Sequence, residues 1–415
     1  KMQIRATVID PNNGHVVAIL GGRHLPSVQL GLDRAVQTGR STGSSIKPVL
    51  DYAPAIQYLN WSTAKMLDDS KYVYPGTNIQ LYDWDNKYDG MMTMRKALEQ
   101  SRNVPAVKTL ADIGVKRASA FARRLGVNVP ANSGLSVAIG ANASSLQMTG
   151  AYSAFATMGI YHKPQFVSKI ETPDGLTRNY DSNGVRVMKK STAYMITDML
   201  KGVIKHGSGT NAKIPDLYQA GKTGTVKYSD EDLAKYPGYN STPKDSWFVG
   251  YTRSYTIGIW TGYDNLKDGT ISGIGQQSAQ LMYKSMMSYL MRNKPNLNWE
   301  QPKSVIRAKT GGTWQLYVRG HAPAGVSDSA ASYDEDDEET DTNNETNNSG
   351  NTNNTQSSSS EAGTAHQSSR VERSQSSQSS REQSSSSASH TQSSRPTRNE
   401  DNEDHEQNHD DSDKD

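Results

Sequence analysis

The chain has 415 residues, contains no cysteine and carries a formal net charge of +2 at pH 7. The absence of cysteine excludes disulfides and thiolate metal sites. The charge is uneven: residues 328–415 hold 21 acidic and 6 basic residues, and the rest of the chain holds 22 acidic and 39 basic residues. A basic domain favours an anionic polymer, a membrane face or an acidic substrate. Signatures of zinc, homeodomain and RNA-binding modules are missing, so we expect no nucleic-acid partner.

From about Ser327 onward the sequence consists of Ser, Asn, Thr, Gln, Asp and Glu, with almost no large apolar residue. Such a stretch cannot bury enough apolar surface to offset chain entropy, so residues 327–415 are predicted to be a disordered tail. No apolar run is long enough to span a membrane, and the chain begins inside a predicted strand. We therefore expect a fragment whose membrane anchor lies further upstream.

The first elements are a hairpin and a helix. Apolar residues at 4, 6 and 8 and over 16–20 flank the turn Asp10-Pro11-Asn12-Asn13-Gly14, which predicts two strands within residues 4–22. A helical pattern then opens at Ser44 and continues to Leu50, with Pro48 close enough to the helix start to be tolerated.

The middle of the chain is predominantly helical, and the last part returns to strands. Helices are predicted over 93–100, 104–113, 118–125, 146–157 and 193–203. Strands are predicted over 218–226, 247–251 and 255–263, before a final helix over 279–291. This order predicts an α/β (α+β) fold with an antiparallel sheet of about five strands, flanking helices and an inserted all-helical lobe.

The same order predicts three regions. One domain covers residues 1–295, with sheet parts at about 1–43 and 216–295 and the helical lobe at about 51–215. A short C-terminal extension covers 296–326, and the tail covers 327–415.

Ser44-Ser45-Ile46-Lys47 is the first candidate for chemistry. Residues three apart lie on one face of a helix, so Lys47 can approach the Ser44 hydroxyl and act as its base after losing a proton. Burial beside another cation would lower the pKa of this lysine. Ser62-Thr63-Ala64-Lys65 has the same spacing. Ser44 is preferred because Gly43 precedes it and the helical pattern opens there.

Ser101-Arg102-Asn103 lies in a break between two helical stretches. A hydroxyl and an amide two residues apart can both face a cleft, where one relays a proton and the other holds a substrate amide. A helix cap formed by Ser or Asn before Val104-Pro105 is an alternative that does not exclude the first interpretation.

Lys222-Thr223-Gly224-Thr225 lies on a predicted strand. Lys222 and Gly224 then face one way and Thr223 and Thr225 the other, and Gly224 allows another backbone to come close. The hydroxyls and the ammonium suit a carboxylate, and the alternative is an ordinary edge strand with a solvated lysine. The repeat of the pattern at 309–312 lacks strand neighbours and is interpreted as chance.

In this order the three motifs match those of penicillin-binding proteins and class A β-lactamases. Segments 40–48, 100–107, 221–225, 245–251 and 259–263 closely resemble the transpeptidase domain of bifunctional class A penicillin-binding proteins of the Gram-positive type, and the resemblance covers roughly residues 5–295. It implies a penicillin-binding/serine β-lactamase-like fold. The glycosyltransferase domain and membrane anchor of that class have no counterpart in this sequence.

The resemblance also implies peptidoglycan cross-linking. Ser44 would attack the D-Ala-D-Ala carbonyl of a stem peptide with Lys47 as base, and Ser101 and Lys222 would complete a proton relay. Substrate would be bound by Asn103, Thr223, Gly224 and Thr225, and the N–H groups of Ser44 and Thr225 would form the oxyanion hole. The implied partners are stem peptides, lipid-linked glycan strands and β-lactams, at the extracytoplasmic face of the bacterial cell membrane. No cofactor or metal is implied.

Other functions share parts of this pattern. A β-lactamase would need a group that activates a deacylating water, and no Glu-x-x-Leu-Asn pattern lies between Ser101 and Lys222. A D,D-carboxypeptidase would share every motif and differ only in using water as acceptor. A β-lactam sensor or a non-catalytic wall-binding module is the alternative outside enzymes, although a silent module would normally have lost part of the motif set.

Overall fold

The main sheet of the protein has five antiparallel strands. The computed structural model describes residues 1–23, 31–37, 39–180, 182–239 and 242–329. The strand order is β13-β14-β15-β1-β2, with all neighbours antiparallel. The strands are β1 (Gln3–Ile9), β2 (Val16–Leu20), β13 (Ala220–Lys227), β14 (Pro243–Tyr251) and β15 (Thr256–Gly262). The predicted five-stranded antiparallel sheet is therefore confirmed.

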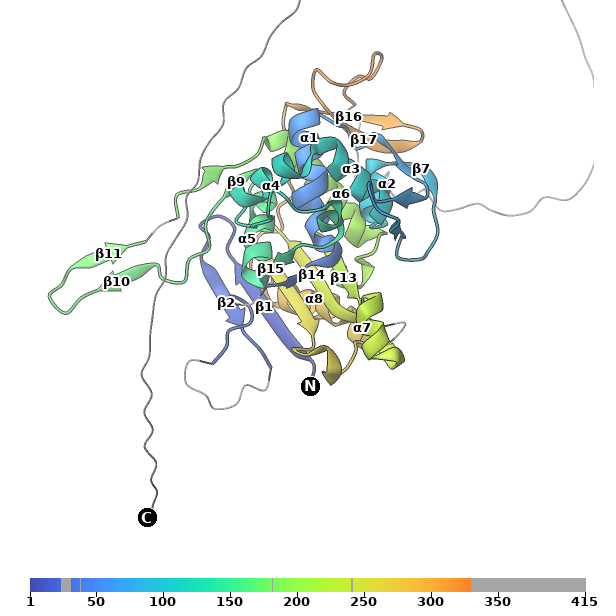
Figure 1. Cartoon of the computed structure of the whole chain (residues 1–415). Helices are drawn as coiled ribbons and strands as arrows, with labels where there is room; N and C mark the ends of the chain where they lie inside the picture. Colours follow the sequence, from blue (N-terminus) through green and yellow to red (C-terminus); the bar gives the residue numbers. More distant parts are fainter. Residues whose placement is uncertain (24–30, 38, 181, 240–241, 330–415) are drawn as a thin grey trace, which may run out of the picture. The chain divides into compact units, whose positions relative to one another are not determined.

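Helices cover both faces of this sheet (Figure 1). The helix α5 (Ser145–Ala156) packs against β1, β14 and β15, and α6 (Lys190–Lys205) packs against β13. On the other face, α8 (Ser278–Leu290) packs against β14 and β15. Alternation along β14 produces the two cores: Trp247, Val249 and Tyr251 join the core shared with α5, whereas Phe248 joins the core shared with α8.

The inserted part lies between β2 and β13 and contains, besides α5 and α6, the predicted helices not yet described. It holds η1 (Gly43–Ile46), η2 (Pro48–Tyr52), α1 (Ala53–Leu59), α2 (Met94–Glu99), α3 (Asn103–Ile113) and α4 (Val115–Arg124). The expectation that it is all-helical is wrong. It also contains paired short strands, among them β4 (Met66–Asp69) with β7 (Gly90–Thr93), β5 (Tyr72–Val73) with β6 (Gln80–Leu81), and β10 (Lys169–Glu171) with β11 (Thr177–Asn179). Strands of two to four residues are too short to leave a period-2 pattern in the sequence.

The C-terminal extension forms a hairpin, β16 (Val305–Thr310) and β17 (Thr313–Val318). Gly311 and Gly312 connect the strands with φ values of 59° and 83°, as a two-residue hairpin turn requires. The second Lys-Thr-Gly sequence thus ends β16 and enters an exposed turn, so the expectation that it lacks strand neighbours is wrong. The predicted boundaries at 295 and 326 stay predictions, and the predicted tail beyond residue 329 lies outside the described residues.

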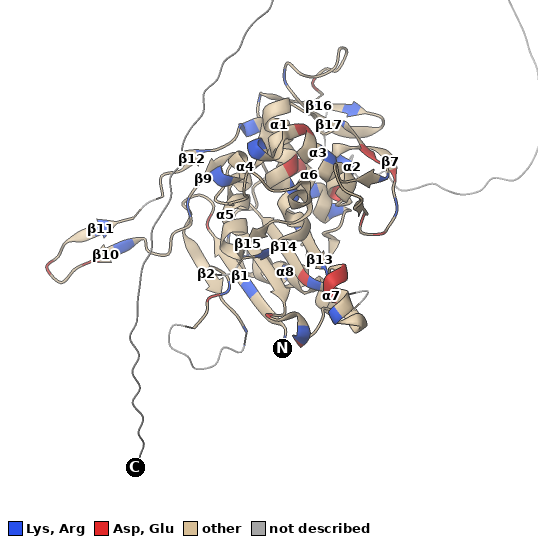
Figure 2. Cartoon of the chain, viewed as in Figure 1, with Lys and Arg blue, Asp and Glu red and all other residues tan. Residues whose placement is uncertain are grey.

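Charged residues are distributed over the elements of the sheet and of the inserted part (Figure 2). The helix α7 (Asp230–Lys235) begins with an acidic turn, visible in red, which follows a capping box at Ser229 and Asp232. Negative side chains stabilise a helix N-terminus because of the exposed N–H groups there. In the described residues no helix is both long and apolar enough to cross a membrane.

Candidate active site

Ser44 lies half-buried on η1, next to the edge strand β13. The helix predicted here begins as a 3₁₀ turn, in which the Lys47 N–H donates to Ser44 O, and continues as a π-helical turn from Pro48. Pro48 has no N–H to donate, which disfavours a regular α-helical start. Gly43 has a φ of 55°, and a methyl group there would lie 2.6 Å from Thr225 O and 2.7 Å from Thr225 N. Glycine therefore brings Ser44 directly against the strand.

Lys47 is fully buried, and its ammonium is held by the loop between α2 and α3. Nζ donates to Ser101 O at 2.7 Å, to Arg102 O at 2.9 Å and to Asn103 Oδ1 at 2.8 Å. Burial is the main reason that the pKa of Lys47 is lowered to about 7; the Asp51 and Asp83 carboxylates act in the opposite direction. Near neutral pH a large fraction of this lysine is therefore an amine that can accept a proton.

Lys222 is the second buried lysine. Its Nζ donates to Ser101 Oγ at 2.8 Å and lies 3.3 Å from Thr223 Oγ1, which in turn contacts Ser208 Oγ at 2.8 Å. Burial and the charge of Lys47 hold the pKa of Lys222 well below its usual value. The alternative of a solvated edge lysine is wrong, because Lys222 is 0% exposed.

The side chains of β13 alternate between two faces as predicted. Lys222 and Gly224 are buried, Thr225 is exposed, and Thr223 is half-buried. Gly224 pairs with Trp247 of β14 and lies against the 42–45 segment, close to Thr42 O. The alternation of a strand thus buries Lys222 and leaves the two threonines more exposed, although Lys222 Nζ still reaches Thr223 Oγ1 at 3.3 Å.

Ser101-Arg102-Asn103 connects α2 to α3. Ser101 has a φ of 60°, in the left-handed region. The expected helix cap is wrong, since Arg102 is the N-cap residue of α3, makes no side-chain capping bond, and is followed by Asn103 as the first helical residue. The Asn103 side chain is used elsewhere: its Oδ1 accepts from Lys47, and its Nδ2 donates to Tyr82 O at 3.0 Å.

The structure thus brings the predicted residues together from three separate parts of the chain. Lys47 and Lys222 are both bonded to Ser101, one through its carbonyl and one through its hydroxyl, and Gly43 places Ser44 beside Thr225. The competing Ser-x-x-Lys sequence is not part of this group. Its Lys65 is exposed, with Nζ 5.0 Å from the Trp61 ring centroid.

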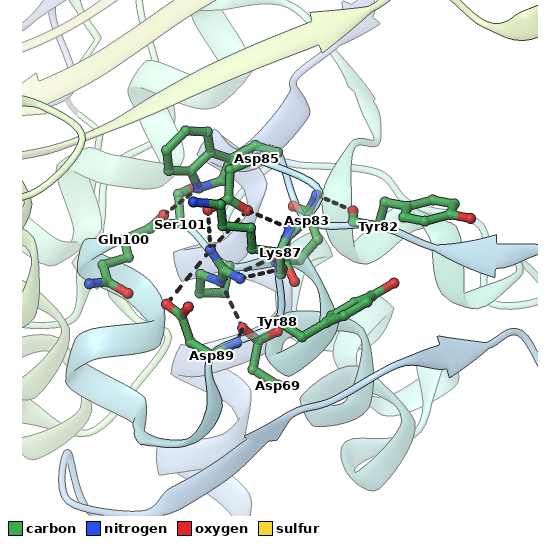
Figure 3. A network of polar contacts seen from close by, with 12 residues as sticks. Asp69, Tyr82, Asp83, Asp85, Lys87, Tyr88, Asp89, Gln100 and Ser101 are labelled. Atoms are coloured by element: carbon green, nitrogen blue, oxygen red, sulfur yellow. Dashed lines mark hydrogen bonds and ion pairs between the residues drawn. The ribbon is translucent and has the colours of Figure 1, made fainter.

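Two features of the site were missed by sequence reasoning. Asp51 is fully buried four residues after Lys47, and among the described residues neither of its carboxylate oxygens has a hydrogen-bond partner. Burial raises the pKa of Asp51 well above its usual value. The second feature is a set of carboxylates, which Figure 3 shows grouped at Asp69, Asp83, Asp85 and Asp89. Asp69 and Asp85 form ion pairs with Arg102. A charged residue inside an apolar helical pattern, and the density of Asp between residues 68 and 89, were the available signals.

The fold is an antiparallel sheet covered by helices on both faces. The site places a candidate nucleophile at a helix start beside the edge strand, and two buried lysines bond one serine. This combination is that of the penicillin-recognising serine acyltransferases. The comparison with known families agrees. The model of the penicillin-binding protein transpeptidase domain matches residues 4–288, and the chain belongs to this family.

Relatives in sequence support the assignment. The chain is 44% identical over 313 residues to penicillin-binding protein 1A of Streptococcus oralis, covering 72% of this chain and 48% of that protein. It is 39% identical over 315 residues to penicillin-binding protein 1A/1B of Bacillus subtilis, covering 74% and 34%. It thus spans about half or less of the length of these relatives.

Two solved structures share the fold. Penicillin-binding protein 1A from Haemophilus influenzae superposes with a TM-score of 0.65 at 21% identity, covering 78% of this chain and 54% of that chain. The PonA1 protein from Mycobacterium tuberculosis in complex with penicillin V gives 0.62 at 24% identity, covering 73% and 81%.

Proposed function

We propose that this chain is a D,D-transpeptidase module that cross-links peptidoglycan stem peptides through an acyl-enzyme on Ser44 and is inhibited by β-lactams. One observation carries the proposal most directly: Lys47 and Lys222 are both buried, both have a lowered pKa, and both bond to Ser101 beside the Ser44 turn. Two lysines with perturbed pKa values that bond the same serine, one at its carbonyl and one at its hydroxyl, are typical of a site that moves protons.

In the proposed acylation, Ser44 Oγ attacks the carbonyl carbon of the D-Ala-D-Ala bond while its proton passes to the neutral Lys47 amine. The N–H groups of Ser44 and Thr225 stabilise the oxyanion. Collapse of the tetrahedral intermediate breaks the peptide bond, and the leaving D-Ala nitrogen receives a proton through Ser101 and Lys222. In the second half-reaction, an amine of a neighbouring stem attacks the ester, forms the cross-link and returns the proton to Ser44.

The remaining residues of the site are proposed to bind the donor peptide. Asn103 holds a substrate amide, and the Thr223 and Thr225 hydroxyls bind the terminal carboxylate. Gly224 has no side chain to obstruct a peptide that lies along β13. The half-buried and exposed positions of the two threonines on the edge strand support this arrangement.

The proposal extends to the setting of the enzyme. The substrates are stem peptides on lipid-linked glycan strands, at the extracytoplasmic face of a bacterial membrane to which the full-length protein is anchored. Support comes from the penicillin-binding relatives and from the surplus of basic residues before residue 328, which suits an anionic surface.

Intact-mass analysis after incubation with benzylpenicillin, followed by peptide mapping, tests the nucleophile. We expect one adduct, on the peptide that contains Ser44. Ser44→Ala should abolish it, and Ser62→Ala, in the other Ser-x-x-Lys sequence, should leave it intact. The reverse pattern, or a wild-type chain that is never acylated, would refute the assignment.

A second assay tests the acceptor. Donor stem peptide is supplied with and without an amine-bearing acceptor stem, and products are separated by mass. A cross-linked dimer is the expected result. Hydrolysed donor alone would indicate a D,D-carboxypeptidase, and acylation by drug without any turnover of peptide would indicate a sensor.

A further inference from the structure

Arg102 lies between Ser101 and Asn103, but its side chain takes no part in the proposed reaction. The residue is 1% exposed, and its guanidinium donates to acceptors on Asp69, Asp85 and Lys87, which lie close together in Figure 3. Nε donates to Asp69 Oδ2 at 2.8 Å, Nη1 to both Asp85 oxygens at 3.1 Å, and Nη2 to Lys87 O at 2.6 Å. Asp83 and Asp89 lie at the edge of the group, at 3.6 and 3.8 Å.

All these acceptors belong to one segment, residues 69–89, which runs from the last residue of β4 to the start of β7. The same segment also holds Asn103: Asp83 Oδ1 accepts from the Asn103 N–H, and Tyr82 O accepts from Asn103 Nδ2. The loop is therefore held from outside by residues 69–89, while on its inner side its carbonyls accept from Lys47 Nζ.

We propose that Arg102 is a positioning residue for acylation. The carboxylates of residues 69–89 fix its guanidinium. The fixed side chain holds in place the carbonyls that bind Lys47 Nζ and the turn that presents the Ser101 hydroxyl. The inference rests on the proposed function, since it assigns Arg102 a role in that same reaction.

The backbone of Ser101 explains why such an anchor is needed. With a φ of 60°, this residue has a conformation that non-glycine residues keep only when the surrounding structure enforces it. The neighbouring side chain, fully surrounded by acceptors, supplies that constraint. Without it the loop can relax, the Ser101 hydroxyl moves away from Lys222, and the Lys47 amine loses fixed acceptors. Small displacements of catalytic groups reduce rates strongly.

Arg102 also acts through its charge, because charges of both signs act on the pKa of Lys47. The Arg102 cation lowers this pKa, and the carboxyl groups of Asp51, Asp69 and Asp83 raise it, while Lys222 is a second cation that faces Lys47. Burial and the neighbouring Asp69 carboxyl raise the pKa of Asp83 to about 7. Removing the guanidinium would leave these carboxylates less compensated, so the pKa of Lys47 would rise. A rise of about one unit would reduce the neutral fraction at pH 7 from about one half to about one tenth.

The test is the second-order rate constant of acylation by benzylpenicillin, measured from about pH 5.5 to about pH 9.5, where the lysine base titrates. For Arg102→Met we expect the acidic limb of the profile to move up by about one pH unit and the rate at pH 7 to fall about fivefold or more. Arg102→Lys keeps a positive charge but not the planar set of donors. The acidic limb of its pH–rate profile should therefore stay close to that of the wild type, while the maximal acylation rate at high pH falls.

Arg307→Met is the matched control. Arg307 is a buried arginine on β16, 5% exposed and 3.7 Å from Asp198, outside the catalytic group. Its removal should lower the Tm without moving the limb. If Arg102→Met behaves in the same way, with a lower Tm and a wild-type profile, the proposal is refuted.

A second variant keeps the test decisive if Arg102→Met does not fold. Asp69→Asn preserves shape and removes a carboxylate that stabilises the Lys47 ammonium, so its limb should move to lower pH. An unmoved limb would overturn the inference. Failure of the wild-type chain to be acylated at all would instead refute the proposed function, which separates the two failures.

Discussion

The close approach of Gly43 to β13 leads to a sharp prediction for Gly43→Ala. The added methyl group would lie 2.6 Å from Thr225 O and 2.7 Å from Thr225 N. Carbon atoms in ordinary contact with their neighbours stay about 3.5 Å away. The Ser44 turn and the strand must therefore separate by roughly 0.7–1 Å, beyond the strain of a left-handed alanine, which costs about 1–2 kcal/mol.

The separation acts directly on the proposed oxyanion hole, because Thr225 supplies one of its two N–H groups. A misplacement of about 1 Å costs up to about 100-fold in rate, so acylation should slow by roughly 10- to 100-fold. Gly175→Ala is the control for strain alone: Gly175 has a φ of 82° in the β10–β11 turn, with nothing within 4 Å of its methyl position.

The assay is covalent labelling by a fluorescent penicillin, followed over time, with the Tm measured in parallel. Gly175→Ala should label at the wild-type rate. If Gly43→Ala also labelled at that rate while remaining folded, the contact between η1 and β13 would have no role in positioning Ser44, and the geometric argument would be refuted.

Three further outcomes are expected. The wild-type acylation rate should fall as the pH drops through about 7, because protonation of Lys47 removes the base; a rate that stays constant through this range would contradict the role of Lys47. Thr63→Val removes a buried hydroxyl that bonds Gln315 Oε1 at 2.6 Å, and should destabilise the fold by about 1–3 kcal/mol in thermal unfolding while leaving labelling unchanged. Asp245→Ala removes the acceptor of Arg40 Nη2 at 2.7 Å and of the buried Trp260 Nε1 at 2.8 Å, and a loss of about 1–3 kcal/mol is expected in denaturant unfolding because the Trp260 N–H is left without an acceptor. An unchanged unfolding midpoint in either variant would show that its buried contact contributes nothing to stability.

Local sequence pattern determined the strands, most of the helices and the candidate chemistry. Alternation in a strand requires Lys222 and Gly224 to face one way, and the structure has them so. Local pattern failed where its signals are weak. Two-residue strands such as β5 and β6 show no period. The helix cap considered for Ser101 or Asn103 is not formed, since Arg102 is the N-cap residue of α3 and makes no side-chain capping bond.

Tertiary structure alone decided how deeply each copy of a motif is buried and how the lysines titrate. Lys47 and Lys65 have the same spacing from a serine, but one is buried and the other exposed. The cause is physical: spacing is a property of neighbouring residues, whereas proton affinity depends on burial and on charges brought together by folding. The carboxylates that hold Arg102, 13 to 33 residues away from it along the chain, become neighbours of the proposed catalytic group only in the folded protein.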